Sequence, residues 1–340
     1  MESILHGFIS DQSTYLLLAI LALMVGILAK GADLLVDKAV EVSHIARIPK
    51  ALIGATIVSL GTTLPEASVS VLAAIEGNPG MALGNAVGSI ICDTGLILGL
   101  GTLIKPLPLD RRVVNRQGWI QLGSGVLLIL VCLPFSHLDA VFQKGGRLAQ
   151  LSGFLFMILL GAYFLWSYRT AMRSENREAC IEDQTLSWQR LTKDLVIMAV
   201  AIVVVIASSK VLIVCAEELA YRLNVPESVI AASLVAFGTS LPELVTVLSS
   251  IRKGQGELAI GNVIGADILN VLFVAGAAAA VTPSGLAVPT DFFVTHFPVM
   301  LGLLLIFRFG ILVCKTHLSR WVGCLLIGTY FGFLLANYLV

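Results

Sequence analysis

Residues 55–66 read ATIVSLGTTLPE and place a proline and a carboxylate inside a run that is otherwise apolar enough to cross a membrane. The stretch recurs 177 positions later, where residues 232–243 read ASLVAFGTSLPE. The register continues without a gap to a Gly-Asn pair at 84–85 and at 261–262. Chance similarity between apolar helices would mostly pair Leu, Ile, Val and Ala. Recurrence of Gly, Pro, Glu and Asn therefore indicates a duplication.

The composition is that of a polytopic membrane protein. Hydrophobic residues make up 57% of the chain, charged residues 13%, and the mean hydropathy is +0.92. A soluble globular domain typically carries about 25% charged residues. The net charge of zero gives no indication of nucleic-acid binding. The six cysteines are scattered without a C-x-x-C pair, so we expect buried hydrophobic side chains rather than disulfides or metal ligands, and no cofactor is predicted.

Spans of about 20 mostly apolar residues predict an all-α fold with ten transmembrane helices. They cover approximately residues 13–36, 49–75, 80–103, 117–135, 148–168, 194–221, 226–251, 256–281, 291–313 and 319–339.

A polar interval at 169–193 divides the spans into two five-helix halves, 1–168 and 194–340. The duplicated segments occupy about 49–103 in the first half and 226–281 in the second.

The positions of Lys and Arg predict the orientation. With the N-terminus outside, the outer loops carry only Lys144, Arg147 and Arg222, and the inner loops and helix ends carry most other basic residues. This bias predicts that both termini are extracytoplasmic and that 169–193 is a cytoplasmic loop of a protein in the plasma (inner) membrane. Glu2 and Asp11, without Lys or Arg, precede the first apolar run, which favours a retained helix over a cleaved signal peptide.

Because five spans separate the two copies, the copies start from opposite faces of the membrane. Inverted repeats are typical of secondary transporters, whose substrate sites lie near the bilayer midplane at the repeat interface. Pro65 and Pro242 each remove a backbone donor, so the helices should kink or open near Gly61 and Gly238. Carbonyl groups freed there would stand beside hydroxyl groups and the acids Glu66 and Glu243. Oxygen ligands without His or Cys suit hard cations such as Ca²⁺ or Na⁺.

The following helices add further polar groups. Asn85, Ser89 and Asp93 recur every four residues and therefore share one helix face. The equivalent face of the second copy offers Asn262, Ala266 and Asn270, with Asp267 about 100° away as a possible fourth acid. The glycines form small-xxx-small pairs that let helices approach closely. They are Gly84, Gly88, Gly261 and Gly265.

The alternative to ion binding is that each intramembrane acid only caps or pairs within a broken helix. An ionised carboxylate at the bilayer centre costs at least ~2.5 kcal/mol. No basic residue lies in spans 2, 3, 7 or 8 away from their ends, so a cation or a proton is the natural partner of Glu66, Glu243 and Asp93. For Lys30, Asp33, Asp37 and Lys38, whose spacings match helical turns, mutual pairing is favoured over a transport role.

Paired G-T-[ST]-L-P-E segments, each followed by G-N-x-[IV]-G, resemble the two alpha-repeats of the calcium/cation antiporter superfamily, the sodium/calcium exchangers and their relatives. The short central loop resembles the compact prokaryotic type. The resemblance implies that Glu66 and Glu243 bind Ca²⁺ and that Asp93 and Asn270 complete the central site. It also implies flanking Na⁺ sites formed by the carbonyl groups of Ser59 and Ala236 and by the hydroxyl groups of Thr62, Thr63, Thr239, Ser240 and Ser89. Asp267, Asn85 and Asn262 are further candidates.

The chain departs from the family pattern on the partner helices. The acid Asp93 lies in the first repeat and the amide Asn270 in the second, the reverse of the common archaeal arrangement. Ala266 stands where a serine is usual, which puts the number of bound Na⁺ ions in doubt, and Ile90 and Asp267 replace asparagines.

These residues favour a membrane antiporter, not an enzyme, that exchanges Ca²⁺ for Na⁺ by alternating access. Ca²⁺/H⁺ exchange, with Glu66 or Asp93 taking up the proton, or a K⁺-coupled exchange would keep the same fold. A passive cation channel is a more distant alternative. An intramembrane hydrolase is disfavoured, since neither His-x-x-x-His nor G-x-S-x-G occurs. The oligomeric state stays open between monomer and oligomer.

Overall fold

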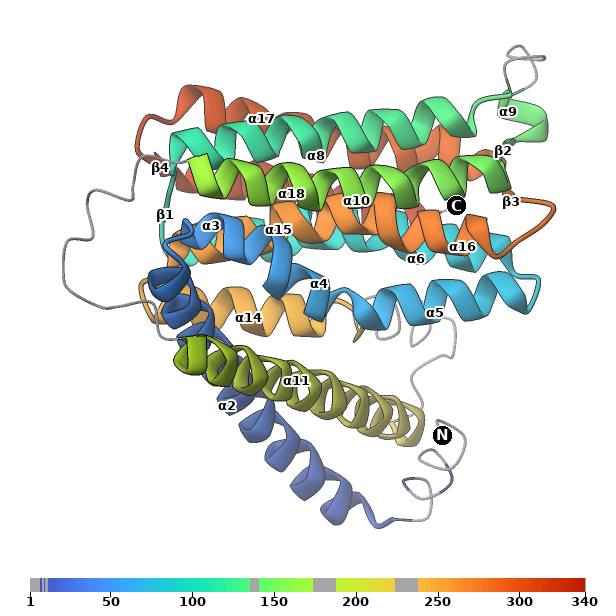
Figure 1. Cartoon of the computed structure of the whole chain (residues 1–340). Coiled ribbons are helices and arrows are strands. Elements are labelled where there is room, and N and C mark those ends of the chain that lie inside the picture. Colours follow the sequence, from blue (N-terminus) through green and yellow to red (C-terminus); the bar gives the residue numbers. More distant parts are fainter. Residues whose placement is uncertain are drawn as a thin grey trace.

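The structure is a computed structural model that describes residues 12–134, 141–173, 188–223 and 238–339, together with Gly7 and Ile9. Almost all of these residues form helices that run lengthwise through one bundle (Figure 1). Six helices are long and apolar enough to span a membrane, or seven if the bent pair 50–62 and 64–75 counts as one span. The all-α polytopic fold is confirmed.

The N-terminal half contains the first, the broken and the third apolar helices, followed by two long ones. Its elements are α2 Thr14–Ala46, α3 Lys50–Ile53, η1 Gly54–Val58, α4 Ser59–Thr62, α5 Leu64–Ile75, α6 Pro79–Ile91, η2 Cys92–Leu98, α7 Gly99–Ile104, β1 Leu107–Pro108, α8 Arg111–Cys132, α9 Val141–Lys144, β2 Gly146–Leu148 and α10 Gln150–Arg173. The η elements are π-helical turns that continue the α-helices on either side.

The C-terminal half repeats this order. Its elements are α11 Trp188–Arg222, α14 Leu241–Arg252, α15 Gly256–Leu269, η6 Asn270–Ala275, α16 Gly276–Ala280, β3 Leu286–Val288, η7 Phe292–His296, α17 Phe297–Val313, β4 His317–Leu318 and α18 Arg320–Leu339. The helices α10 and α11 extend into the interval 169–193, so the connection between the halves is shorter than the polar composition alone suggested.

Two small antiparallel strand pairs, which the hydropathy pattern did not predict, mark the two ends of the bundle. The strand β1 pairs with β4, and β2 pairs with β3, so each pair joins one half to the other. The first residues of α6 lie beside β3, where Gly80 faces Pro289, whereas Gly256 at the start of α15 faces Pro108 of β1. Equivalent helices of the two halves therefore start from opposite ends of the bundle, which is the inverted arrangement that the sequence predicted.

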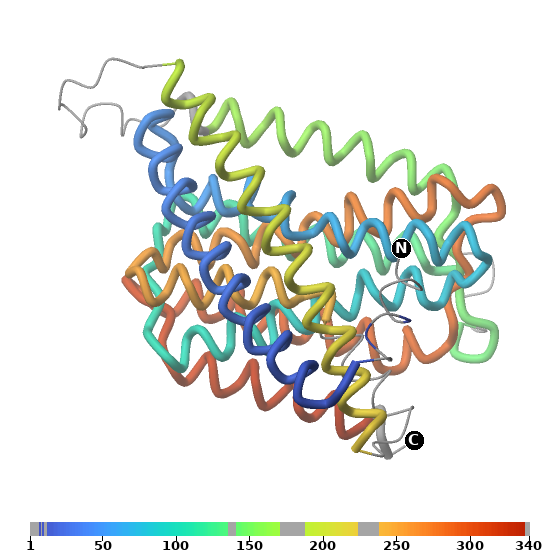
Figure 2. The backbone as a smooth tube through the Cα atoms, turned by 90° about the horizontal axis from the view of Figure 1, so that it is seen from below, coloured from blue at the N-terminus to red at the C-terminus, as the bar shows by residue number. Residues whose placement is uncertain are grey.

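The helices α2 and α11 pack along each other and cross one side of the remaining helices (Figures 1 and 2). Many of their outward-facing residues are large and apolar, among them Leu23 at 59% exposure and Val203 at 64%. Such an apolar surface suits contact with lipid.

The centre of the bundle is a close crossing between η1 and α15. A Cβ atom built on Gly54 would lie 2.6 Å from the Leu258 carbonyl oxygen, and one on Gly261 would lie 2.1 Å from the Ala51 carbonyl oxygen. Gly265 is equally confined, because its Cβ would lie 2.5 Å from the Ala55 Cα atom. The predicted close approach through small residues is confirmed for Gly261 and Gly265. For Gly84 the nearest neighbour is Phe292 at 3.8 Å, and Gly88 meets nothing within 4 Å among the described residues.

Candidate ion-binding site

The first repeat is broken at Thr63. The segments 50–62 and 64–75 meet at 46°, and Pro65 stands in the first turn of α5. Proline has no amide hydrogen to donate to the carbonyl group four residues earlier, which explains the break. The predicted kink near Gly61 is confirmed, and Glu66 sits at the N-terminal end of α5, where the helix dipole favours a negative charge.

The Ser59 carbonyl oxygen, predicted as an ion ligand, is not free in this conformation. It accepts the Thr63 backbone N–H at 2.9 Å and the Thr62 hydroxyl at 3.3 Å. The chain continues as helix up to Thr62 and pairs that oxygen within the turn, so its role as an ion ligand stays a prediction.

The second repeat has a turn directly before α14. Gly238, Thr239 and Ser240 precede the helix, and Pro242 and Glu243 stand in its first turn. Ala236 lies outside the described residues, so the structure does not place its carbonyl group.

The two partner helices change to π-helical winding where they meet the breaks. The turn η2 starts at Cys92, directly before Asp93, and η6 starts at Asn270. A π-turn widens the helix by one residue and is frequent at functional sites. This feature could not be predicted, because a π-turn leaves no distinct hydrophobic period.

The acids and their neighbours are buried, yet many of their polar atoms have no hydrogen-bond partner. Glu66, Asp93, Glu243 and Asn270 are each 1% exposed. The buried oxygen atoms without a partner include Glu66 Oε1 and Oε2, Asp93 Oδ1, Glu243 Oε2, Asn270 Oδ1, Ser89 Oγ and Ser240 Oγ. A buried polar group without a partner costs about 1–3 kcal/mol, and more if charged. Several of these atoms lie at or beside the two breaks, and oxygen atoms of this kind suit a hard cation.

The carboxylates act as one electrostatic group. Glu66 is repelled by Glu243 and Asp93, and Asp93 by Glu243 and Asp267. The ion pairs among the described residues involve none of these four acids. The Thr63 hydroxyl donates a hydrogen bond to Glu243 Oε1 at 3.4 Å. Neutral donors cannot cancel this charge, so a cation or protons must do so.

Asn85 joins the two repeats. Its amide nitrogen donates to the Glu66 carbonyl oxygen at 3.1 Å and to the Ser70 hydroxyl at 3.0 Å. Its amide oxygen accepts the Thr239 hydroxyl at 3.3 Å. In this conformation Asn85 is therefore saturated and positions other residues. The equivalent Asn262 is fully buried, and both its side-chain N and O atoms have no partner among the described residues.

Asp267 is a fourth buried acid of the core. Its Oδ2 atom accepts the Thr94 hydroxyl and the Gln121 amide, the latter at 2.5 Å, while Oδ1 has no partner. Because Thr94 follows Asp93 directly, Asp267 extends the polar group toward α8. The repeated motifs do not point to Gln121, although a glutamine in the apolar part of a span is a visible signal.

The helix α11 covers the two breaks. A Cβ on Gly61 would lie 2.3 Å from the Ile202 side chain, and one on Gly238 would lie 2.7 Å from Ile213. Both isoleucines belong to α11, so this one helix packs against both glycines.

Comparison with known proteins identifies the family. A sequence profile described as "Sodium/calcium exchanger protein" matches residues 16–169 and 193–339. The chain belongs to this family. It is 29% identical over 349 residues to the sodium/calcium exchanger MaX1 of Methanosarcina acetivorans, covering 94% of this chain and 98% of that protein. It is 30% identical over 336 residues to the inner membrane protein YrbG of Escherichia coli, covering 95% and 98%.

The fold of this family member matches solved structures of the sodium-calcium exchanger NCX_Mj. For the form soaked with 10 mM Na⁺ and zero Ca²⁺ the TM-score is 0.79 at 25% identity, covering 94% of this chain and 98% of that one. The chain is thus an integral membrane transport protein, and the resemblance noted from the paired motifs is confirmed.

Proposed function

We propose that this exchanger moves Ca²⁺ across the membrane in exchange for Na⁺ by alternating access. The observation that carries the proposal is the set of buried, unpaired carboxylate oxygens contributed by both inverted repeats. The names of MaX1 and NCX_Mj support it, because both are sodium/calcium exchangers.

In this proposal Glu66 and Glu243 are the principal Ca²⁺ ligands, completed by Asp93 and Asn270. The described residues contain no group of three Asp, Glu, His or Cys side chains that would hold a metal alone, so hydroxyl and carbonyl oxygens must contribute. Ca²⁺ takes six to eight oxygen ligands, which agrees with a mixed set. The hydroxyl groups of Thr62, Thr63, Thr239, Ser240 and Ser89 would serve Na⁺, and Ser59 and Ala236 would offer carbonyl oxygens only after the breaks rearrange.

Charge explains why exchange would be obligatory. Glu66, Asp93 and Glu243 together carry three negative charges, which one Ca²⁺ reduces to one and three Na⁺ cancel. An empty, fully ionised site buried in the bilayer would be far costlier than either loaded form. The empty carrier therefore seldom changes sides, and each Ca²⁺ transported is replaced by Na⁺.

The helices α2 and α11 are the proposed moving elements. They pack on one another and lie outside the crossing of η1 and α15, and α11 covers both breaks. We place the protein in the plasma (inner) membrane with both termini outside, so that the β1–β4 end is cytoplasmic. The name of YrbG, an inner membrane protein, supports that location.

The test is Ca²⁺ uptake into proteoliposomes driven in turn by a Na⁺, a K⁺ and a proton gradient. Uptake that requires the Na⁺ gradient supports the proposal. Uptake driven by a proton or K⁺ gradient alone would show that this ion, and not Na⁺, is the driving ion. Single-channel current would show that the protein is a passive channel. Glu66→Gln should abolish uptake while Glu218→Gln, a matched change that removes an ion pair to Arg222 within α11, should not.

A further inference from the structure

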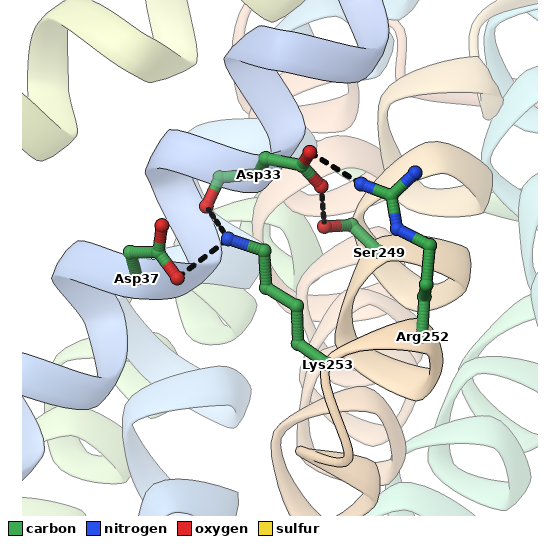
Figure 3. A network of polar contacts seen from close by, with 5 residues as sticks. All are labelled: Asp33, Asp37, Ser249, Arg252 and Lys253. Atoms are coloured by element: carbon green, nitrogen blue, oxygen red, sulfur yellow. Dashed lines mark hydrogen bonds and ion pairs between the residues drawn. The ribbon is translucent and has the colours of Figure 1, made fainter.

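Five side chains fasten α2 to the end of α14 (Figure 3). Asp33 accepts a hydrogen bond from the Ser249 hydroxyl at 2.6 Å and forms an ion pair with Arg252. Lys253 donates to the Asp33 carbonyl oxygen at 2.9 Å and forms an ion pair with Asp37 at 2.5 Å. The predicted pairing of the acids within α2 was wrong, because both find bases on α14. Lys38 likewise reaches Asp194 of α11 at 3.0 Å as well as Glu41.

This clamp, formed by Asp33, Asp37, Ser249, Arg252 and Lys253, lies at one end of the bundle. The helix α14 ends at Arg252, and Gly256, which starts the next helix, packs against Pro108 of β1. The clamp therefore belongs to the β1–β4 end. It holds α2, one of the two crossing helices, to the core at that end.

The inverted repeat defines the equivalent positions at the opposite end. The register that aligns Gly61 with Gly238 pairs Asp33 of α2 with Lys210 of α11, and Lys253 with Glu76. The charges are exchanged at both positions. An acid on α2 faces a base after α14, and a base on α11 would face an acid after α5. Both ends thus pair an acid with a base, although neither position carries the same residue in the two halves.

The two ends are packed differently in this structure. Ser249 of the clamp is 6% exposed, whereas its equivalent Leu72 is 57% exposed. Ile75, the equivalent of Arg252, is 65% exposed, and Glu76 forms no ion pair among the described residues. The helix α2 packs on α14, but α11 does not pack on α5 in the same way. Among the described residues, a crossing helix packs on α14 at one end, and no equivalent packing on α5 is present at the other.

We propose that Glu76 and Lys210 form a second clamp. It closes the β2–β3 end when the first clamp, in which Asp33 faces Arg252 and Lys253, opens. The inference rests on the proposed alternating access and names the residues that stabilise its two states. Each clamp stabilises only one of the two states. Only a contact that differs between the states can shift their equilibrium. Both clamps lie at the ends of the bundle, so they act on access without touching the ions.

The experiment is thiol cross-linking of the full-length protein in liposomes. Cysteines replace Glu76 and Lys210, and the exposed Cys324 and Cys180 of the polar interval 169–193 are changed to Ser. A bifunctional thiol reagent about as long as a Lys–Glu pair is then added. Adding Asp33→Asn and Asp37→Asn should raise the cross-linking rate about fivefold, the shift expected when two partly exposed ion pairs are lost. Arg252→Gln with Lys253→Gln should have the same effect and guards against a folding defect specific to α2.

The matched control is Glu218→Gln, which removes an ion pair within α11, to Arg222, that bridges no helices. The control should leave the cross-linking rate unchanged. An unchanged rate in both clamp variants, or an equal rise in the control, would overturn the proposal. Cross-linking does not require transport. If the cross-linking rate does not change as expected while Na⁺ still drives Ca²⁺ uptake, only this inference is refuted. Cross-linking as expected without Na⁺-driven uptake would refute the proposed function alone.

Discussion

Gly265→Ala tests whether the crossing of η1 and α15 shapes the site. The new Cβ would lie 2.5 Å from the Ala55 Cα, the Ala55 carbonyl oxygen and the Ser59 hydroxyl. Two of these atoms belong to backbone and cannot rotate away. Ordinary contact between carbon atoms is about 3.5–4.0 Å, so the two helices must separate by ~1 Å.

Overpacking of this kind costs about 1–3 kcal/mol. The displaced segment carries Ser59 and leads directly to Thr62 and Glu66, so we expect weaker Ca²⁺ binding as well as lower stability. Where the whole cost falls on the Ca²⁺-bound form, 1–3 kcal/mol corresponds to about a 5- to 150-fold weaker apparent affinity. The assay is Ca²⁺ binding to the purified protein, together with its thermal unfolding in detergent.

The control is Gly302→Ala in α17, where the added Cβ meets nothing within 4 Å. It should leave affinity unchanged and stability equal or slightly higher, because alanine favours a helix. If Gly265→Ala binds Ca²⁺ like the parent protein, the close crossing does not position the ligands and the reasoning fails.

Three further predictions follow from single contacts. Gly61→Ala should slow transport, because its Cβ would lie 2.3 Å from Ile202, and Ile202→Ala should restore the rate; a slow double variant would contradict this cause. Tyr163→Phe should lower the free energy of unfolding by about 1 kcal/mol, since its hydroxyl donates to the Ala55 carbonyl oxygen at 2.9 Å, and an unchanged midpoint in thermal unfolding would refute it. Asp93→Asn should reduce Ca²⁺ uptake more than Asn270→Ala, because only the first removes charge, and the reverse order would show that Asn270 is the main partner helix ligand.

The fold could be predicted largely from the sequence, because each strong signal was local or repeated. Pro65 removes a hydrogen bond wherever it stands in a helix, so the break at Thr63 followed from chemistry alone. The inverted arrangement followed from the odd number of spans between two copies of one motif. The strand pairs did not, because β1 and β4 are two residues long and carry no alternation.

The sequence predicts which residues belong to the candidate site better than it predicts their contacts. Glu66 and Glu243 were visible as acids without local partners. The occupied Ser59 carbonyl depended on how far the helix persisted before the break, which residue types do not reveal. The partners of Asp33 and Asp37 lie more than two hundred residues away, so helical spacing favoured the wrong pairing within α2.

The central claim is that two glutamates from inverted repeats bind the Ca²⁺ that Na⁺ replaces. The most direct measurement is Na⁺-driven uptake of radiolabelled Ca²⁺ into proteoliposomes that contain Glu66→Gln or Glu243→Gln, with folding checked by gel filtration. Both variants should remain folded and lose uptake, because the amide keeps the shape and removes the charge. Uptake at the parent rate by either variant would contradict the account.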